Sequence, residues 1–282
     1  MVKRISNPIF NELIDINLIK KINLKIISKK TRDKKMDVYQ DEKSRIILLQ
    51  KYSKNNFYKN KNVSLKKFFN DDLRRYNKFK NLIGNKKILD FGCGWGGFLN
   101  KFKNKKNKFG VEIRKECIKY INYNLKFKVF NNLSEINQKF DFISLFHVLE
   151  HIPNQIMILK KIRKKLKKDG KIIIEVPHAK DFLIETLNLK SFKNFTFWSE
   201  HLILHTEESL CKILNIAGFK VVNFEYLQRY NINNHFKWII ENKPNGHNDY
   251  KGMFNDKIKK RYIQFLQNIK QTDTILVTAK AN

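Results

Sequence analysis

The residues best suited to chemistry in this sequence follow two short apolar runs. Asp90 lies in the first run, residues 87–91, and Glu112 lies near the end of the second, residues 108–113. Three glycines follow Asp90 at alternate positions: Gly92, Gly94 and Gly96. A strand, a glycine turn and then a helix bring backbone N–H groups against a nucleotide-type ligand. Glycine is needed there because a Cβ atom would block both the turn and the approach of the ligand.

The two carboxylates discriminate between ligands for this turn. Gly92, Gly94 and Gly97 also satisfy G-x-G-x-x-G, which makes NAD an alternative ligand. However, a carboxylate at Asp90 repels phosphates and attracts an ammonium group, and Glu112 stands where ribose hydroxyls are bound. A ligand with a ribose, a purine and an amino-acid end, but no phosphate, meets these demands. S-adenosylmethionine is such a ligand.

Four motifs in order resemble those of the class I S-adenosylmethionine-dependent methyltransferases. Residues 88–96 look like the first motif, Glu112 matches the ribose-binding acid, and residues 141–152 and 169–178 resemble the fourth-strand and fifth-strand motifs. The resemblance implies methyl transfer with S-adenosylmethionine as the cofactor. It also implies a set of cofactor-binding residues: Asp90, Phe91, Gly92, Gly94 and Gly96 at the methionine end, Glu112 at the ribose, Asn131 near the adenine, and Phe146 and His147 lining the pocket.

Strand and helix patterns alternate from residue 87 onward, which predicts an α/β fold with helices on both faces of a mostly parallel sheet. Together with the resemblance, this gives a Rossmann-like, doubly wound, seven-stranded sheet with a final antiparallel strand. The predicted strands are 87–91, 108–113, 126–130, 141–147, 171–177, 220–228 and 274–278, and the predicted helices between them are 96–104, 114–123, 153–168 and 207–217.

The rest of the chain divides around this unit. We expect residues 1–75 to form an N-terminal extension with a small hairpin subdomain at 36–50. Residues 76–282 would form the methyltransferase domain, with insertions at 178–205 and 229–272. Such insertions beyond the carboxyl ends of strands are where substrate specificity usually resides.

A second candidate site lies at the end of the first insertion. Residues 198–210 resemble the Glu-His segment of sugar C-methyltransferases, which implies that His201 is a general base oriented by Glu200. An imidazole suits this role because its pKa lies near neutrality. The alternative is that His201 and His205 only pack or cap a helix. The tyrosine that usually accompanies this histidine is absent, and Trp198 stands nearby.

We expect no metal site. The sugar C-methyltransferases carry a cysteine-bound zinc in a small N-terminal domain, but no cysteine precedes Cys93 in this chain. Residues 147–151 match the zinc-protease signature H-x-x-E-H, which requires a continuous helix. Here the motif follows a predicted strand and precedes Pro153. We therefore expect Glu150 and His151 to brace a helix start.

The amino-acid composition bears on the cellular location of the protein and on the kind of acceptor it binds. The formal net charge is +32, from 58 Lys+Arg and 26 Asp+Glu, yet only nine of the basic residues are arginine. This lysine excess favours a solvated surface over a nucleic-acid interface. Three widely spaced cysteines, and no leader or membrane-spanning run, predict a cytoplasmic protein.

The expected function is methyl transfer to a small-molecule or glycan-linked acceptor, with a sugar, nucleotide-sugar or glycan precursor favoured. Arg229, His235 and His247 lie among aromatic residues in the second insertion, as a pocket for an anionic glycosyl group would require. The alternative drawn from the charge is an RNA methyltransferase or an RNA-binding module. It requires RNA binding that weakens steeply with salt. A cofactor-binding protein without catalysis is a third possibility.

Overall fold

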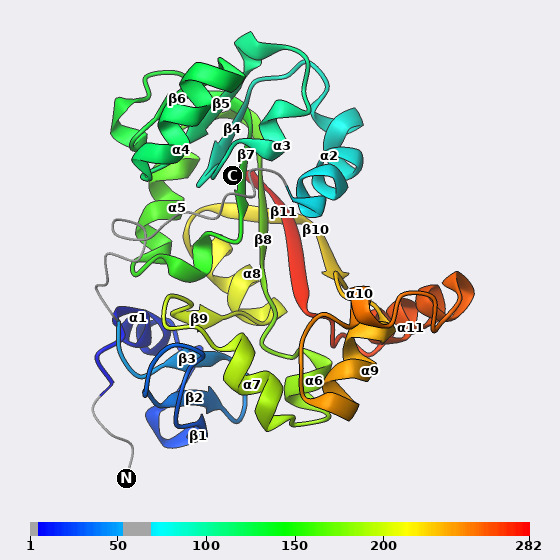
Figure 1. Ribbon diagram of the computed structural model, residues 1–282. Coiled ribbons are helices and arrows are strands. Elements are labelled where there is room, and N and C mark those ends of the chain that lie inside the picture. The colour runs from blue at the N-terminus through cyan, green and yellow to red at the C-terminus, as the bar shows by residue number, and fades with distance from the viewer. Residues whose placement is uncertain (1–4, 53–68) are drawn as a thin grey trace.

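The computed structural model describes residues 5–52 and 69–282. Their strands form a seven-stranded sheet, in the order β10-β11-β8-β7-β4-β5-β6, and a four-stranded sheet, in the order β1-β2-β3-β9 (Figure 1). The four-stranded sheet lies at the end of the molecule toward which β8 runs (Figure 1). The fold therefore places a second layer of structure beyond the carboxyl end of this central strand.

The larger sheet has the predicted Rossmann-like architecture. Its strands are β4 (Ile88–Phe91), β5 (Lys108–Val111), β6 (Lys128–Phe130), β7 (Phe140–Phe146), β8 (Leu166–Pro177), β10 (Phe219–Leu227) and β11 (Thr274–Ala281). The pairs β4–β5, β5–β6, β4–β7 and β7–β8 are parallel, whereas β11 is antiparallel to both β8 and β10. The predicted antiparallel final strand is confirmed, and it lies inside the sheet.

Helices cover both faces of this sheet because successive strand residues point to opposite sides. Ile88 and Phe142 pack in a cluster with α2, α3 and η3, while Leu89 and Ile143 pack in a cluster with α5 and α8. The helices around the sheet are α2 (Asn70–Ile83), α3 (Gly97–Asn100), η2 (Lys105–Asn107), α4 (Lys115–Tyr120), η3 (Ile121–Leu125), η4 (Leu133–Glu135), η5 (Leu149–His151), α5 (Gln155–Arg163) and α8 (Glu207–Ile216).

Two predicted helices are shorter than expected. The helix predicted over 153–168 ends at Arg163, because Leu166 already pairs with Phe140 and begins β8. Gly170 lies inside this strand, where a Cβ atom would approach the backbone oxygen of Phe140 to 2.9 Å. The helix predicted over 96–104 is reduced to α3, and the buried Lys108 ammonium donates to the carbonyl oxygens of Leu99, within α3, and Phe102, just beyond it.

The smaller sheet joins two distant parts of the chain. Its strands are β1 (Leu24–Ser28), β2 (Val38–Asp41), β3 (Ile47–Leu49) and β9 (Ile203–Leu204), all antiparallel to their neighbours. The β2–β3 pair confirms the predicted hairpin at 36–50. Strand β9 comes from the first insertion, so the N-terminal extension and that insertion share one sheet. The boundary expected after residue 75 falls within α2.

Helices also cover both faces of the smaller sheet. Ile9 and Leu13 of α1 pack in the same cluster as Leu48 of β3, whereas Trp238 packs with Ile47 on the opposite face. The remaining helices are α1 (Pro8–Asp15), η1 (Lys21–Asn23), α6 (Phe182–Glu185), α7 (Lys190–Thr196), α9 (Ile232–Glu241), α10 (Gly246–Asp249) and α11 (Asp256–Asn268). Within the described ranges, none of these helices is both long and apolar enough to span a membrane.

Candidate functional site

The glycine turn after β4 adopts the conformation that its sequence requires. Gly92, Gly94 and Gly96 have φ angles of +79°, +56° and +76°, a region that favours glycine. A Cβ atom on Gly92 would lie 2.5 Å from Cγ2 of Val148. The turn therefore packs against the segment that follows β7, which brings two of the sequence motifs into contact.

The first of the two predicted acids is buried beside the turn. Asp90 is only 5% exposed, and its Oδ1 accepts a hydrogen bond of 2.7 Å from the hydroxyl of Ser144 on β7. Burial raises the pKa of Asp90 to about 7, although the Ser144 hydrogen bond and the nearby Arg75 charge lower it. Its charge therefore depends on pH near neutrality.

The second predicted acid holds the turn in place. One oxygen of Glu112 accepts hydrogen bonds from the backbone N–H of Gly94 at 2.8 Å and from Nη2 of Arg114 at 2.9 Å. The other oxygen accepts bonds from the backbone N–H groups of Ile113 and Arg114 and from Arg114 Nε. The carboxylate thus joins the end of β5 to the glycine turn after β4.

The other predicted cofactor-binding residues have different surroundings. Phe91 is half-buried at the end of β4, and Asn131 is exposed after β6, where its backbone N–H donates to Glu135. The Phe146 ring is buried, with its centroid 5.0 Å from that of Phe98 and 4.6 Å from Cζ of Arg75. Phe146 therefore packs in the apolar core between the sheet and its helices.

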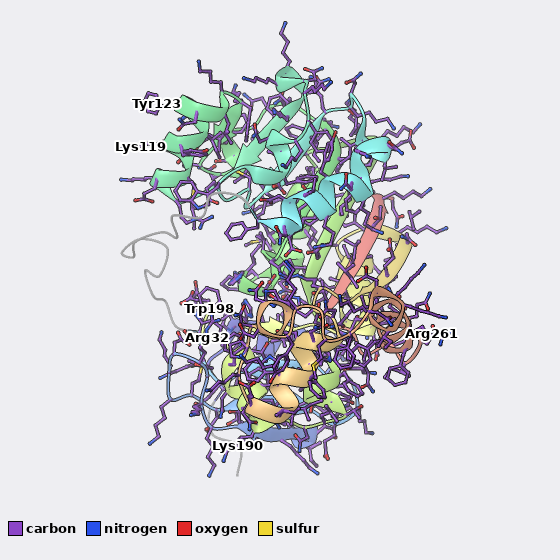
Figure 2. All side chains as sticks on the ribbon, turned by 45° about the vertical axis from the view of Figure 1, so that its right-hand side comes forward. Arg32, Lys119, Tyr123, Lys190, Trp198 and Arg261 are labelled. Carbon is purple, nitrogen blue, oxygen red and sulfur yellow. The ribbon has the colours of Figure 1, made fainter. Side chains whose placement is uncertain are left out.

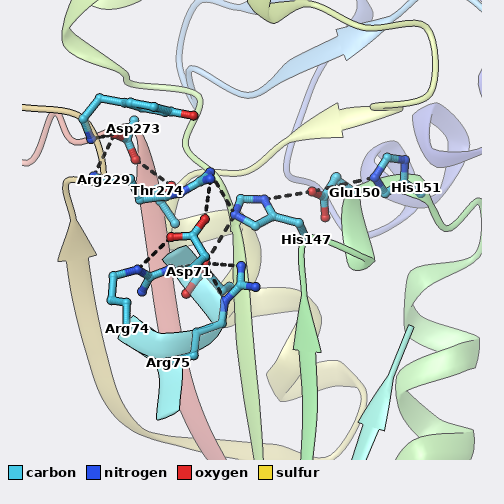
Figure 3. Close-up of polar contacts among 11 residues, drawn as sticks. Asp71, Arg74, Arg75, His147, Glu150, His151, Arg229, Asp273 and Thr274 are labelled. Atoms are coloured by element: carbon cyan, nitrogen blue, oxygen red, sulfur yellow. Dashed lines mark hydrogen bonds and ion pairs between the residues drawn. The ribbon is translucent and has the colours of Figure 1, made fainter. Parts of the chain in front are cut away.

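His147 stands between two buried carboxylates at the end of β7 (Figure 3). Its Nδ1 lies 3.3 Å from Glu150 Oε1, and its Nε2 lies 3.3 Å from Glu175 Oε1. Burial and the Arg229 charge lower the pKa of His147, but the two neighbouring carboxylates outweigh them and raise it. The φ angle of +55° is uncommon for a residue other than glycine. It turns the chain from the strand into η5.

A charged network surrounds Glu175, which the sequence analysis did not single out. Glu175 is fully buried on β8, and its Oε1 accepts hydrogen bonds from Arg74 Nη2 at 2.8 Å and Arg75 Nη2 at 2.7 Å (Figure 3). Arg229 donates from Nη2 to Asp71 at 2.6 Å. The sequence did contain a signal for Glu175: it is an acid inside the apolar run 172–176, and a buried charge requires a partner.

The predicted base, His201, lies beside Glu150 and His151. Potential ligand atoms of these three residues all lie within 4.8 Å of one another, and we refer to them as the Glu-His group. The ring centroids of His201 and His151 are 4.9 Å apart, and the Trp198 centroid is 5.2 Å from that of His201. Since Val148 contacts the glycine turn, the Glu-His group lies close to that turn.

Glu200 reaches this group through its backbone. Its carbonyl oxygen lies 2.9 Å from His151 Nδ1, whereas its carboxylate interacts electrostatically with Lys34 and Asp33. The side-chain carboxylate that lies within 4.8 Å of an imidazole nitrogen of His201 is therefore that of Glu150. The sequence motif predicted that Glu200, the chain neighbour of His201, orients the imidazole. In the fold, Glu150 of η5 also provides a carboxylate near this imidazole.

The N-terminal extension holds the His201 segment. The Arg32 guanidinium carbon lies 5.0 Å from the Trp198 ring centroid, and Ser199 N donates to Asp33 Oδ1 at 3.0 Å (Figure 2). Asn7, the N-cap of α1, donates from its side chain to the Leu202 carbonyl at 2.8 Å. These contacts fix the position of the loop relative to η5.

Burial determines the charge state of the Glu-His group. Desolvation and, to a smaller extent, the neighbouring His151 lower the pKa of His201 to about 3, so the imidazole is neutral at pH 7. Burial raises the pKa of Glu150, but interactions with His147 and His151 outweigh it and lower this pKa to about 2. A neutral imidazole next to a carboxylate can accept a proton or bind a cation.

One protein-family model matches this chain. It describes a methyltransferase domain and covers residues 60–223, which is more than half of the sequence. The match includes the glycine turn, both predicted acids and the Glu-His group. No curated protein matches the sequence significantly.

Solved structures of low sequence identity are also similar. A SAM-dependent methyltransferase from Archaeoglobus fulgidus is 21% identical, with 74% of this chain and 94% of that chain covered and a TM-score of 0.49. A possible histamine N-methyltransferase from Thermotoga maritima is 17% identical, with 75% and 89% covered and a TM-score of 0.48. Coclaurine N-methyltransferase, bound to N-methylheliamine and SAH, is 16% identical, with 81% and 76% covered and a TM-score of 0.47.

Proposed function

We propose that this chain, which belongs to the methyltransferase-domain family and uses S-adenosylmethionine, methylates a hydroxyl-bearing small molecule. A sugar, a nucleotide-sugar or a glycan precursor is the favoured acceptor class. The acceptor would bind beside the Glu-His group, and a hydroxyl or an acidic carbon would receive the methyl group.

One observation carries this proposal. The Gly92 turn packs against Val148, and only two residues later Glu150 and His151 approach His201. The groups that bind a cofactor and a group that accepts a proton are thus adjacent. A general base must lie within hydrogen-bonding reach of the proton that it removes, which this adjacency makes possible.

The residues of the cofactor side fit S-adenosylmethionine. Asp90 offers a carboxylate to an ammonium group, and Glu112 stands at the ribose position. The cofactor supplies an electrophilic methyl group bound to a sulfonium. Phosphate-free recognition suits this pair of acids because each would repel a phosphate.

The Glu-His group would control the acceptor's proton. As the acceptor oxygen forms its bond to the methyl carbon, its O–H proton passes to the neutral His201 imidazole. The electrons of the broken carbon–sulfur bond remain on sulfur. Glu150 stabilises the imidazolium that results, because opposite charges within a few ångströms attract strongly in a buried site. Proton transfer to a base whose pKa lies near the working pH contributes about 100-fold to 10,000-fold to the rate. Against the desolvation that lowers the pKa of His201 to about 3, the Glu150 charge raises it toward that range.

The His201→Ala variant tests the proposal. We expect turnover to fall at least about 100-fold, because the proton acceptor is lost, while affinity for S-adenosylhomocysteine stays within twofold. Tyr123→Ala is the control, since the Tyr123 side chain is 78% exposed and lies outside the proposed site. Turnover is followed by transfer of a labelled methyl group to a panel of sugars and nucleotide-sugars. Unchanged turnover in His201→Ala would remove the assigned role.

The same panel of acceptors separates this proposal from the alternative of an RNA methyltransferase. A mixed RNA sample serves as the competing acceptor, because the net charge of +32 favours polyanions. Methylation of RNA that falls steeply between low and high salt, without methylation of any sugar, would overturn the proposed acceptor class.

Asp90 predicts a pH-dependent affinity for S-adenosylhomocysteine. With a pKa of about 7, this carboxyl is mostly protonated at pH 6 and mostly ionised at pH 7.5. The ligand's ammonium group prefers the ionised form, so affinity should rise about eightfold over this interval, as the ionised fraction does. Calorimetry at both pH values measures the change, and Asp90→Asn should remove it. An equal pH dependence in Asp90→Asn would contradict the assignment.

A further inference from the structure

We infer that Glu150, His151 and His201 form a binding site for a divalent cation of the Zn²⁺ type. From the sequence we expected no metal, because H-x-x-E-H over residues 147–151 follows a predicted strand and precedes Pro153 rather than lying on one continuous helix. The fold uses only the second half of that motif, in η5, and adds His201 from the segment before β9. The site therefore consists of two imidazoles and one carboxylate.

The geometry allows one ion to reach all three side chains. Their nearest potential ligand atoms lie within 4.8 Å of one another, and His151 Nε2 lies 3.9 Å from Glu150 Oε1. Ligand atoms that surround a tetrahedral zinc ion are about 3.4 Å apart, given bond lengths of about 2.1 Å. Small side-chain rotations are enough to close this difference. No backbone rearrangement is required.

The Glu150 carboxylate gives independent support for a ligand. Glu150 is fully buried, yet within the described residues neither of its oxygens makes a hydrogen bond of normal geometry. The nearest ion-pair contact is His147 Nδ1 at 3.3 Å. A buried carboxylate without hydrogen bonds is costly unless a cation compensates for its charge. An ion between Glu150 and the two imidazoles would supply that compensation.

The surroundings of His151 orient it as a ligand. Its Nδ1 lies 2.9 Å from the Glu200 carbonyl oxygen, which can only accept, so this nitrogen carries the hydrogen. The lone pair of the neutral ring is then on Nε2, the nitrogen facing Glu150. Ligating histidines usually donate their other N–H to a carbonyl or carboxylate in this way, which fixes the tautomer. Glu200 therefore contributes through its backbone.

The donor set selects the kind of ion. Imidazole nitrogen favours zinc and the other late first-row metals, whereas magnesium prefers an octahedral set of oxygens. Three protein ligands leave at least one position open, as in catalytic rather than structural zinc sites. The ion would be able to bind an acceptor oxygen next to the cofactor turn.

The catalytic role of the ion rests on the proposed function, whereas its binding does not. A hydroxyl bound to such an ion loses its proton near neutral pH. The proton passes to solvent water, and the oxygen keeps its electron pair for the methyl carbon. His201 then acts as a ligand, and it is the proton acceptor only in the metal-free protein.

Zinc titration of the full chain, without a histidine tag and after treatment with a chelator, tests the site. We expect one tight Zn²⁺ site by calorimetry, weakened at least tenfold in His201→Ala and in Glu150→Gln. Mg²⁺ at the same concentration should bind much more weakly. Glu208→Gln, at an exposed glutamate outside the site, is the control and should bind as the wild type does. Co²⁺ substitution adds a visible absorption band that reports ligand number.

The outcomes separate this inference from the proposed function. Zinc binding that is equal in the wild type and both site variants would overturn the cation site. Circular dichroism and S-adenosylhomocysteine binding show whether each variant is folded, and Glu150→Gln preserves side-chain shape where His201→Ala does not. If zinc binds but no hydroxyl acceptor is methylated, the proposed acceptor fails and the site stands. If no zinc binds and the enzyme keeps full turnover in the presence of a chelator, the cation site fails and the proposed function stands.

Discussion

Replacing Glu112 by alanine is expected to weaken the binding of S-adenosylhomocysteine about 100-fold. Under the proposed function the carboxylate accepts hydrogen bonds from the ribose hydroxyls, and each hydrogen bond to a charged group contributes about 1.5–3 kcal/mol. Glu112 also accepts from the Gly94 backbone at 2.8 Å, so its removal releases the glycine turn. Both effects reduce affinity. Calorimetry with S-adenosylhomocysteine measures the loss directly.

Glu116→Ala is the matched control for this experiment. Glu116 lies on the adjacent helix α4, carries the same charge and is exposed. Its removal should leave affinity within twofold, because the exposed charge is screened. Glu112→Gln should give an intermediate loss, since the amide keeps one acceptor oxygen. Wild-type affinity in a folded Glu112→Ala variant would contradict the ribose assignment, and preferential binding of NAD would reverse the choice of ligand.

Replacing Glu175 by glutamine is expected to lower the free energy of unfolding by about 3 kcal/mol. The substitution preserves shape but removes a fully buried negative charge, which leaves Arg75, only 9% exposed, without its neutralising partner. Breaking a buried ion pair from one side costs about 3–5 kcal/mol, because the remaining charge is desolvated and uncompensated. Urea unfolding at pH 7.5, analysed by linear extrapolation, measures this loss.

An exposed ion pair provides the comparison. Asp256→Asn removes the partner of Lys259 on α11, where the Asp256 side chain is 99% exposed, and should cost less than about 1 kcal/mol. Equal losses in both variants would contradict the role of burial.

The stabilising contribution of Glu175 also depends on pH. Burial raises the pKa of Glu175, but His147 and Arg75 outweigh it and hold this pKa well below its usual range. Its stabilising contribution is therefore complete above about pH 4.5 and is lost as the pH falls below that.

The sequence by itself determined the glycine turn and the strand before it. Asp90, the glycines after it and the strand that contains it are contiguous, so their local conformation follows from residue type: glycine adopts the positive φ angles of the turn at lower cost than other residues. The hairpin at 36–50 and the start of α8 at Thr206, whose side chain accepts from Ser209 N, were predictable for the same reason. In each case the contacts span a few residues of chain.

Only the tertiary structure decided which distant residues share a site. Glu150 and His201 are brought together because η5 and β9 dock on one another, and the Leu202 N–H donates to the Glu150 carbonyl at 2.9 Å. The Glu175–Arg75 pair likewise joins β8 to α2. The helix predicted to extend to residue 168 ended early for a similar reason, since pairing of Leu166 with Phe140 competes with helix propensity. Long-range packing and desolvation set these outcomes, and neither is encoded in local spacing.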